Sequence, residues 1–240
     1  MNADEPALAD QTLFLDCETD CMLHEAGYSS NPAFVRSREE EAFERRCALA
    51  HMRVSVCVTK YAGARSPPVA HLLESTREQA ESVQRELGDA CTVVAGADLL
   101  VAEMDAARAL CAWNAAFDLG VLEKYAKSPK HLTAAAWTAK TIDPMVQIAA
   151  SVSGQYLSLN EAAGESKTGT GEQAVAWLRS GRWTELVSYC VQDVLLLESV
   201  AAPLLRGETR RLPVAVNLVP GEWQKAATRS ISTQTPLAQT

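Results

Sequence analysis

The chain has 240 residues and 48% of them are hydrophobic, so it is long and apolar enough to bury one substantial core. Its formal net charge of −8 argues against a generic nucleic-acid coat and against a basic protein of membrane surfaces. A nuclease remains compatible with this charge, because carboxylates that bind metal ions are themselves acidic.

The sequence also limits the compartment and the redox chemistry. No apolar run approaches the roughly 20 residues that a membrane-spanning helix needs. The first ten residues carry acids where a signal peptide carries basic residues. We therefore expect a soluble, intracellular protein of cytoplasm or nucleus, with no membrane partner. The seven cysteines form no C-x-x-C pair, which predicts reduced core residues and neither a zinc knuckle nor a disulfide scaffold.

The first half of the chain begins with strands. TLFLDC predicts a strand from Thr12 to about Cys17. Residues 20–50, with the loop-like GYSSNP and a charged helical run from Ser37 to Arg46, indicate an insertion whose helix has a solvated face and could overhang the site. MRVSVCVTKY predicts a second strand with Val54, Val56 and Val58 on one face, and PVAHLL predicts a third.

The second half mixes helices with short strands. We expect helix over 76–110 with a break near 88–96, a buried strand over 109–113, and a helix capped by Asn114. Ser158 and Glu161 have the spacing of a capping box, residues 167–171 form a glycine-rich loop, and 184–205 form a long helix. This order predicts an α/β domain over 1–206 with a mixed sheet, followed by a C-terminal extension over 207–240 whose last dozen residues are disordered.

Three acidic motifs follow one another along the chain. Asp16 and Glu18 point to one face of the first strand, although D-x-E alone is usually a solvated strand end. Asn114 and Asp118, in N-x-x-F-D, lie one turn apart on a helix, as a capped amphipathic helix would also place them. In the long helix Tyr189 and Asp193 likewise share one face.

In this order the motifs resemble those of the DEDD superfamily of 3′→5′ exonucleases, over roughly Leu13 to Ser199. The histidine subclass would need histidine at Ser188, whereas Tyr189 occupies the position of the tyrosine (DEDDy) subclass, and Thr19 completes the form D-x-E-T. The resemblance implies an RNase H-like (DnaQ-like) fold, with a mixed central β-sheet flanked by helices.

The resemblance also implies the catalytic residues Asp16, Glu18, Asp118, Tyr189 and Asp193. Carboxylates a few ångströms apart repel by roughly 4 kcal/mol per pair at an effective dielectric near 20, so four of them need cations. The four acids would hold two Mg²⁺ or Mn²⁺ ions, which clamp the attacking and leaving oxygens of a phosphoryl displacement. Tyr189 would orient the attacking water, because a tyrosine with a pKa near 10 is a poor base at neutral pH.

Four further residues would contact substrate, each with a structural alternative. Thr19 would meet the terminal nucleotide or is a strand-end threonine, and Phe117 would stack on a base or fills the core. Asn114 would contact substrate in addition to capping its helix. Lys167 would contact a phosphate or is a solvated loop lysine. Trp113 is assigned to the core. Asp143 is either a turn acid or a residue that supports the site residues without contacting substrate or metal itself.

The implied activity is removal of nucleoside monophosphates from a single-stranded or frayed 3′ end, with DNA weakly preferred to RNA. The alternatives are an RNA-trimming enzyme of the RNase D or deadenylase kind, a catalytically silent relative that binds nucleic acid or protein, and an unrelated α/β protein with chance motifs. Because the chain is acidic, its affinity for nucleic acid would be weak and salt-sensitive unless a helicase or polymerase partner delivers the end.

Overall fold

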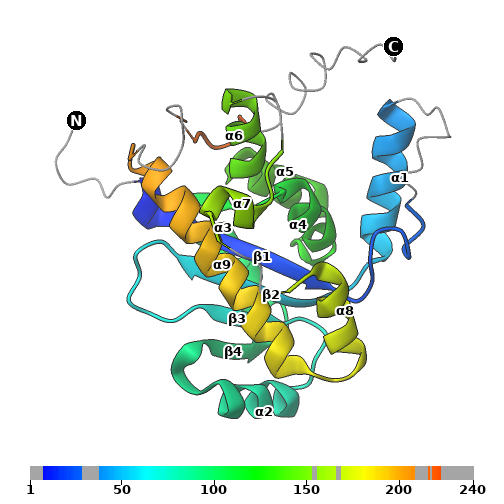
Figure 1. Cartoon of the computed structure of the whole chain (residues 1–240). Coiled ribbons are helices and arrows are strands. Elements are labelled where there is room, and N and C mark those ends of the chain that lie inside the picture. Colours follow the sequence, from blue (N-terminus) through cyan, green and yellow to red (C-terminus); the bar gives the residue numbers. More distant parts are fainter. Residues whose placement is uncertain are drawn as a thin grey trace, which may run out of the picture.

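The computed structural model describes residues 8–28, 38–152, 156–165, 169–208, 216 and 218–222. It shows an α/β protein in which a mixed six-stranded sheet is flanked by helices (Figure 1). The strands are β1 (Thr12–Thr19), β2 (Val54–Tyr61), β3 (Val69–Leu72), β4 (Thr92–Ala95), β5 (Ala109–Cys111) and β6 (Thr141–Ile142). The predicted α/β class with a mixed sheet is confirmed.

The strand order is β4-β3-β2-β1-β5-β6. β2 pairs antiparallel with both β1 and β3, while the β3–β4, β1–β5 and β5–β6 pairs are parallel. β1 therefore lies inside the sheet, with a neighbour along each edge. β5 pairs with β1 only over Thr12 to Phe14, so the carboxyl end of β1 is held by its antiparallel ladder with β2.

The helices follow one another along the chain as η1 (Leu8–Gln11), α1 (Arg38–His51), α2 (Arg77–Leu87), η2 (Gly88–Ala90), α3 (Asp98–Ala106), α4 (Ala115–Leu122), η3 (Glu123–Tyr125), α5 (Lys130–Ala139), α6 (Pro144–Val152), α7 (Leu159–Ala163), α8 (Gly171–Arg179) and α9 (Trp183–Leu205). α9 runs across one face of the sheet against β1 and β2, with α7 and α8 beside it (Figure 1). α3 and α4 belong to the core on the other face.

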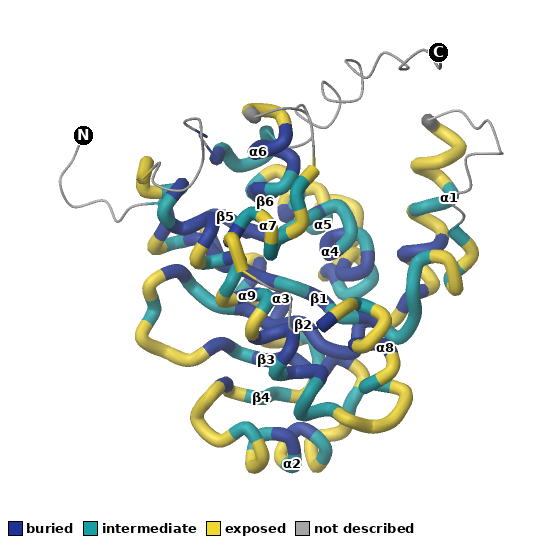
Figure 2. Tube along the Cα trace, viewed as in Figure 1, coloured by how far each residue is buried: buried dark blue, intermediate teal, exposed yellow. Residues whose placement is uncertain are grey.

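Two apolar clusters fill the two faces of the sheet. All of its strands except the edge strand β4 are mostly buried (Figure 2). Along β1, Leu13, Leu15 and Cys17 enter the cluster of α3 and α4, whereas Phe14 enters the cluster of α9. Because side chains alternate along a strand, the next two positions on the Phe14 face are Asp16 and Glu18. Both acids therefore point to the side of α9.

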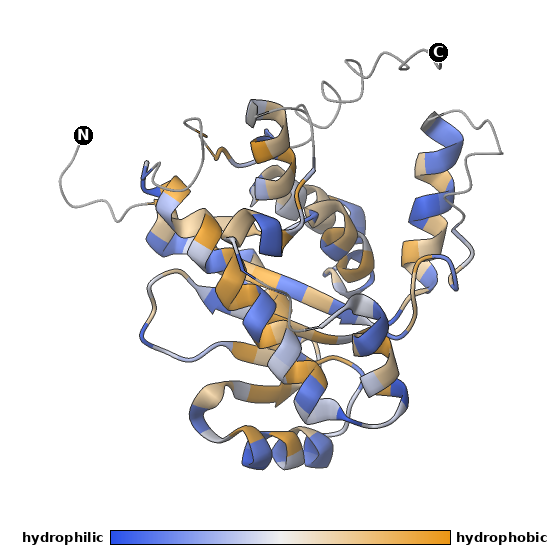
Figure 3. Ribbon diagram, in the orientation of Figure 1, coloured by the Kyte–Doolittle hydropathy of each residue, from blue (hydrophilic) through white to orange (hydrophobic). Residues whose placement is uncertain are grey.

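α9 is the one helix of the described residues whose length and hydropathy would allow it to cross a membrane. Hydrophobic and hydrophilic stripes alternate along it (Figure 3), and more than half of its most apolar stretch is buried inside the protein. Residues such as Leu186, Val187 and Val194 fill the core. Its apolar character is therefore explained by packing against the sheet.

Three expectations need correction. Val54 packs in the cluster opposite to that of Val56 and Val58, since the β1–β2 register shifts between Glu18 and Thr19. The break near 88–96 contains the edge strand β4, where the amide of Gln84 accepts from Val93 N and donates to Cys91 O. The strand expected over 109–113 ends at Cys111.

The insertion and the C-terminal extension both pack against the sheet and its helices, through different contacts. α1, within the insertion, presents its charged residues to solvent as expected and buries Ala48 and Leu49 beside α4. In the C-terminal extension, Leu218 is buried in the core of α9, and Gln147 of α6 exchanges two hydrogen bonds with the backbone of Val219. The last dozen residues lie outside the described part.

Candidate metal centre

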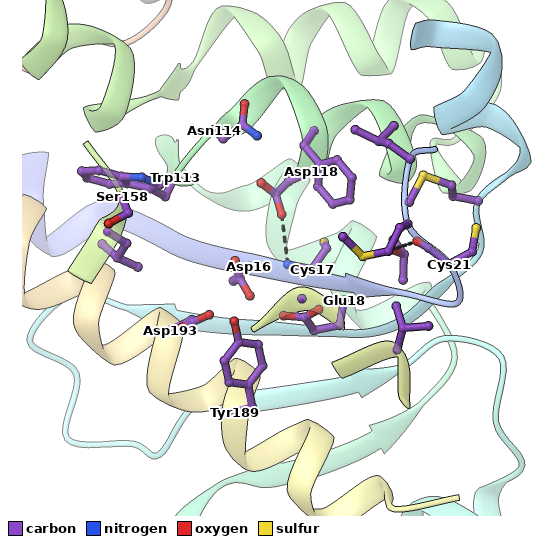
Figure 4. Close-up of a pocket in the computed structure, with 18 of the residues that line it drawn as sticks. Asp16, Cys17, Glu18, Cys21, Trp113, Asn114, Asp118, Ser158, Tyr189 and Asp193 are labelled. Carbon is purple, nitrogen blue, oxygen red and sulfur yellow. Dashed lines mark hydrogen bonds between the residues drawn. The ribbon is translucent and has the colours of Figure 1, made fainter. Parts of the chain in front are cut away.

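A group of three carboxylates forms where β1 meets α9 (Figure 4). Asp16 and Glu18 come from β1, and Asp193 comes from the face of α9 that packs over this strand. Each offers an oxygen within 4.8 Å of the others, and all three are partly buried. Carboxylate oxygens at this separation fit a divalent cation, which would offset their mutual repulsion.

Asp118 approaches β1 from α4, across the strand from Tyr189 and Asp193 (Figure 4). It is 2% exposed, and its Oδ1 accepts a hydrogen bond of 3.0 Å from the backbone N–H of Cys17, between the two acids of β1. Burial, and then the charge of Asp16, raises the pKa of Asp118 well above its usual range. The fourth predicted acid therefore adjoins the site without belonging to the group of three.

Tyr189 is buried one turn before Asp193, and the two side chains share a hydrogen bond. Burial, followed by the charges of Asp193 and Glu18, raises the pKa of Tyr189 far above its ordinary value of 10.0. Its ring stands edge-on to Trp177 at 5.9 Å between centroids. The hydroxyl is therefore a protonated donor of fixed direction, and a poor proton acceptor.

Cys190 is a residue of the site that the sequence analysis missed. Its Sγ lies 3.4 Å from the backbone oxygen of Asp16 and 3.4 Å from Asp16 Oδ2. Burial, and then the charges of Asp16 and Glu18, raises the pKa of the thiol well above its usual range, so it stays protonated and donates. No spacing in the sequence distinguishes this cysteine from an ordinary core residue.

The expected side-chain cap of Asn114 on α4 is wrong. Asn114 precedes the helix in the left-handed conformation (φ 63°), and its side chain makes no capping hydrogen bond. Asp143 takes this role, because its carboxylate accepts from the backbone N–H of Ala115 (2.8 Å) and of Asn114 (3.3 Å). Burial raises the pKa of Asp143 to about 6.

The acids line a cleft of about 610 Å³. Asn114, Phe117 and Thr19 also line it, as expected for substrate contacts, but the Thr19 hydroxyl donates to Cys21 O at 2.9 Å. Lys167 lies outside the described residues. Trp113 packs against the core as expected, but it is only partly buried and also lines the cleft. Its Nε1 has no hydrogen-bond partner among the described residues.

Much of the remaining lining of the cleft is apolar. It is built mainly from the following side chains: Met22, Leu23, Met52, Met145, Leu157, Leu159 and Val175. The loop that carries Met22 is fastened to α8, since Arg179 donates to both carboxylate oxygens of Glu25 at 3.0 Å, and Glu25 also accepts from Met22 N. The cleft thus has both acidic and apolar side chains in its lining, which suits a ligand with both polar and flat apolar parts.

No protein-family model and no curated protein sequence matches the chain. Function is therefore inferred from the geometry of the site and from the motifs that form it.

Proposed function

We propose that the chain is a divalent-metal-dependent 3′→5′ exonuclease of RNase H-like fold, of the DEDDy type, which hydrolyses DNA from its 3′ end and releases nucleoside monophosphates. The observation that carries this proposal is the convergence of Asp16, Glu18 and Asp193 within 4.8 Å of one another. Asp118 and Tyr189 line the same cleft from α4 and α9. All five residues belong to the motifs that resemble the superfamily.

The donor set fits two hard cations such as Mg²⁺ or Mn²⁺. It consists of carboxylate oxygens, which these ions prefer, and it includes the buried Asp118, whose pKa is raised by burial and by the neighbouring charge of Asp16. Asp16, Glu18, Asp118 and Asp193 would hold the ions. Two bound ions supply a clamp for the attacking and leaving oxygens of an in-line displacement at phosphorus.

The side chains around the acids have separate roles in this proposal. Cys190 fixes the orientation of Asp16 through its thiol hydrogen bond. Tyr189 keeps its proton and donates it to Asp193, so its hydroxyl oxygen is left to accept a hydrogen bond from the attacking water and orient it. Asp193 in turn holds the Tyr189 hydroxyl in place. A hydroxyl held in a fixed direction contributes by positioning, which can supply a large part of a rate enhancement.

The cleft suits a chain end. Its volume of about 610 Å³ is that of a small-molecule site, so it holds a terminal nucleotide and not a duplex. Phe117 and the methionines that line the cleft would contact the base without regard to sequence. Because the chain is acidic overall, a helicase or polymerase partner that delivers a frayed 3′ end would strengthen an otherwise salt-sensitive encounter.

The test is degradation of matched DNA and RNA single strands in the presence of Mg²⁺, Mn²⁺ or EDTA. We expect metal-dependent shortening that the Asp16→Asn variant loses and the Asp89→Asn variant keeps. Asp89 is an exposed acid in η2, so its variant carries the same change of charge outside the cleft. A folded wild-type protein that binds both strands without shortening either one would instead support the silent binding protein.

A further inference from the structure

The backbone conformation of Asn114 is exceptional in this protein. It is the only non-glycine residue of the described part with a positive φ, at 63°. Asparagine tolerates this region better than most residues, but the conformation is still disfavoured unless its surroundings impose it. Asn114 lines the acidic cleft, so a contact that imposes this conformation also decides how its side chain is placed there.

The cause is Asp143, at the junction of β6 and α6. Its Oδ2 accepts from Ala115 N at 2.8 Å, and its Oδ1 accepts from Asn114 N at 3.3 Å and from Val146 N at 3.4 Å. One carboxylate thus binds the first backbone groups of two helices, α4 and α6. Asp143 is 0% exposed and does not line the cleft, so it acts through the residues that it holds.

The consequence concerns the side chain of Asn114. Its carboxamide makes no hydrogen bond to any described residue, although it lines the cleft next to Asp118 (Figure 4). An amide offers two donors and one acceptor oxygen, which match the hydroxyl and ring-oxygen groups of a sugar or the edge of a base. In the left-handed conformation this group is kept from capping α4 and is left for a ligand.

We propose that Asp143 is a positioning residue, which holds Asn114 in the left-handed conformation so that the carboxamide meets the terminal nucleotide in the cleft. This inference rests on the proposed exonuclease function. Asparagine cannot replace Asp143, because its side-chain NH₂ group is itself a donor. That group would face one of the three backbone N–H groups, which needs an acceptor. The role therefore requires a carboxylate.

The experiment is a double-mutant cycle of Asp143→Asn with Asn114→Gly. Glycine accepts a positive φ without strain and lacks the carboxamide, so the helix keeps its start while the ligand contact is lost. Each variant is assayed for kcat and KM on a 5′-labelled DNA single strand with Mn²⁺, and for its Tm. Thr76→Ala, which removes the side-chain cap of α2 away from the cleft, controls for a simple loss of a helix cap.

We expect D143N and N114G each to raise KM by about three- to tenfold, with kcat changed less, as for the loss of one hydrogen bond to substrate. In the double variant KM should equal that of N114G alone, whereas the effect of D143N on Tm should persist in both backgrounds. T76A should lower Tm and leave KM unchanged. If D143N does not fold, Asp143→Ser, which keeps an acceptor for the helix start, takes its place in the cycle.

Two results overturn the inference while leaving the exonuclease in place. One is an active wild type in which D143N lowers Tm without changing KM. The other is an effect of D143N on KM that adds to that of N114G. A folded wild type with no metal-dependent cleavage of DNA or RNA overturns the exonuclease, and the role of Asp143 with it.

Discussion

The hydroxyl of Tyr189 is hydrogen-bonded to the carboxylate of Asp193, one turn further along α9. Asp193 is at the same time one of the three acids whose oxygens lie within 4.8 Å of one another. A single helix face thus supplies both an acid of the candidate metal centre and a protonated donor beside it. This pairing explains why a tyrosine and an aspartate share a helix face that otherwise packs in the core.

Tyr189→Phe should separate positioning from metal binding. The variant keeps the ring, its contact with Trp177 and all four acids, but loses the hydroxyl that donates beside the metal site. We expect kcat to fall by about 10- to 100-fold, with Mn²⁺ affinity within about threefold of the wild type. Steady-state kinetics and titration calorimetry measure the two quantities. An unchanged kcat would remove Tyr189 from the catalytic residues.

Metal binding should be visible in stability without any substrate. Asp16, Glu18 and Asp193 repel one another in the metal-free protein, so Asp16→Asn should stabilise it in EDTA by on the order of 1 kcal/mol. The wild type should gain about 2.7 kcal/mol when Mn²⁺ is raised to about one hundred times its Kd, whereas D16N gains less. Urea unfolding measures both. Equal gains in D16N and wild type would contradict a metal site at these residues.

The buried Asp143 predicts a pH dependence of stability. Its pKa rises from 3.8 to about 6 on folding, so the folded state holds its proton more tightly than the unfolded state. The stability that it contributes is complete below about pH 4 and is lost as pH rises through about 6, on the order of 3 kcal/mol in all. Urea unfolding in EDTA at pH 4 and pH 7 should show a smaller loss for Asp143→Asn than for wild type. Equal losses would show that other groups cause the change.

A substitution at Gly169 should show how closely the glycine-rich loop approaches Tyr189. A Cβ at this position would lie 3.0 Å from two ring carbons of Tyr189, whereas a Cβ at Gly171 would meet only Met22, at 3.8 Å. Gly169→Ala should therefore displace the tyrosine ring and lower kcat by about tenfold. Gly171→Ala, two residues away, should leave kcat within about twofold. Similar effects of the two changes would mean that the loop acts otherwise than by contact with Tyr189.

Sequence periodicity was sufficient to predict which faces carry the acids, but not which residues hold the site in place. Alternation along β1 placed Asp16 and Glu18 on one face, and the helical repeat placed Tyr189 and Asp193 on another. The cap of α4 could not be predicted, because Asp143 reaches it from another element and no local pattern links the two. Cys190 had no signal either, since a buried thiol beside a carboxylate has the same sequence context as a core cysteine.

The same distinction applies to the fold. The runs that became β1 and β2 are long enough for their patterns to predict strands, and the capping box of Ser158 and Glu161 is present at the start of α7. β4 has only four residues between a helix and a glycine, and Gln84 rather than another strand satisfies part of its outer edge. Short elements that depend on such tertiary contacts are hard to predict from the local sequence.

The most direct test of the central claim compares two labels on one DNA strand. With Mn²⁺ present, the 5′-labelled strand should shorten as a ladder, while the same strand labelled at its 3′-terminal nucleotide should release that label as a mononucleotide from the earliest time points. Both signals should disappear in EDTA and in Asp16→Asn. Release of the 3′ label in longer fragments, or no metal-dependent release at all, would contradict a 3′→5′ exonuclease.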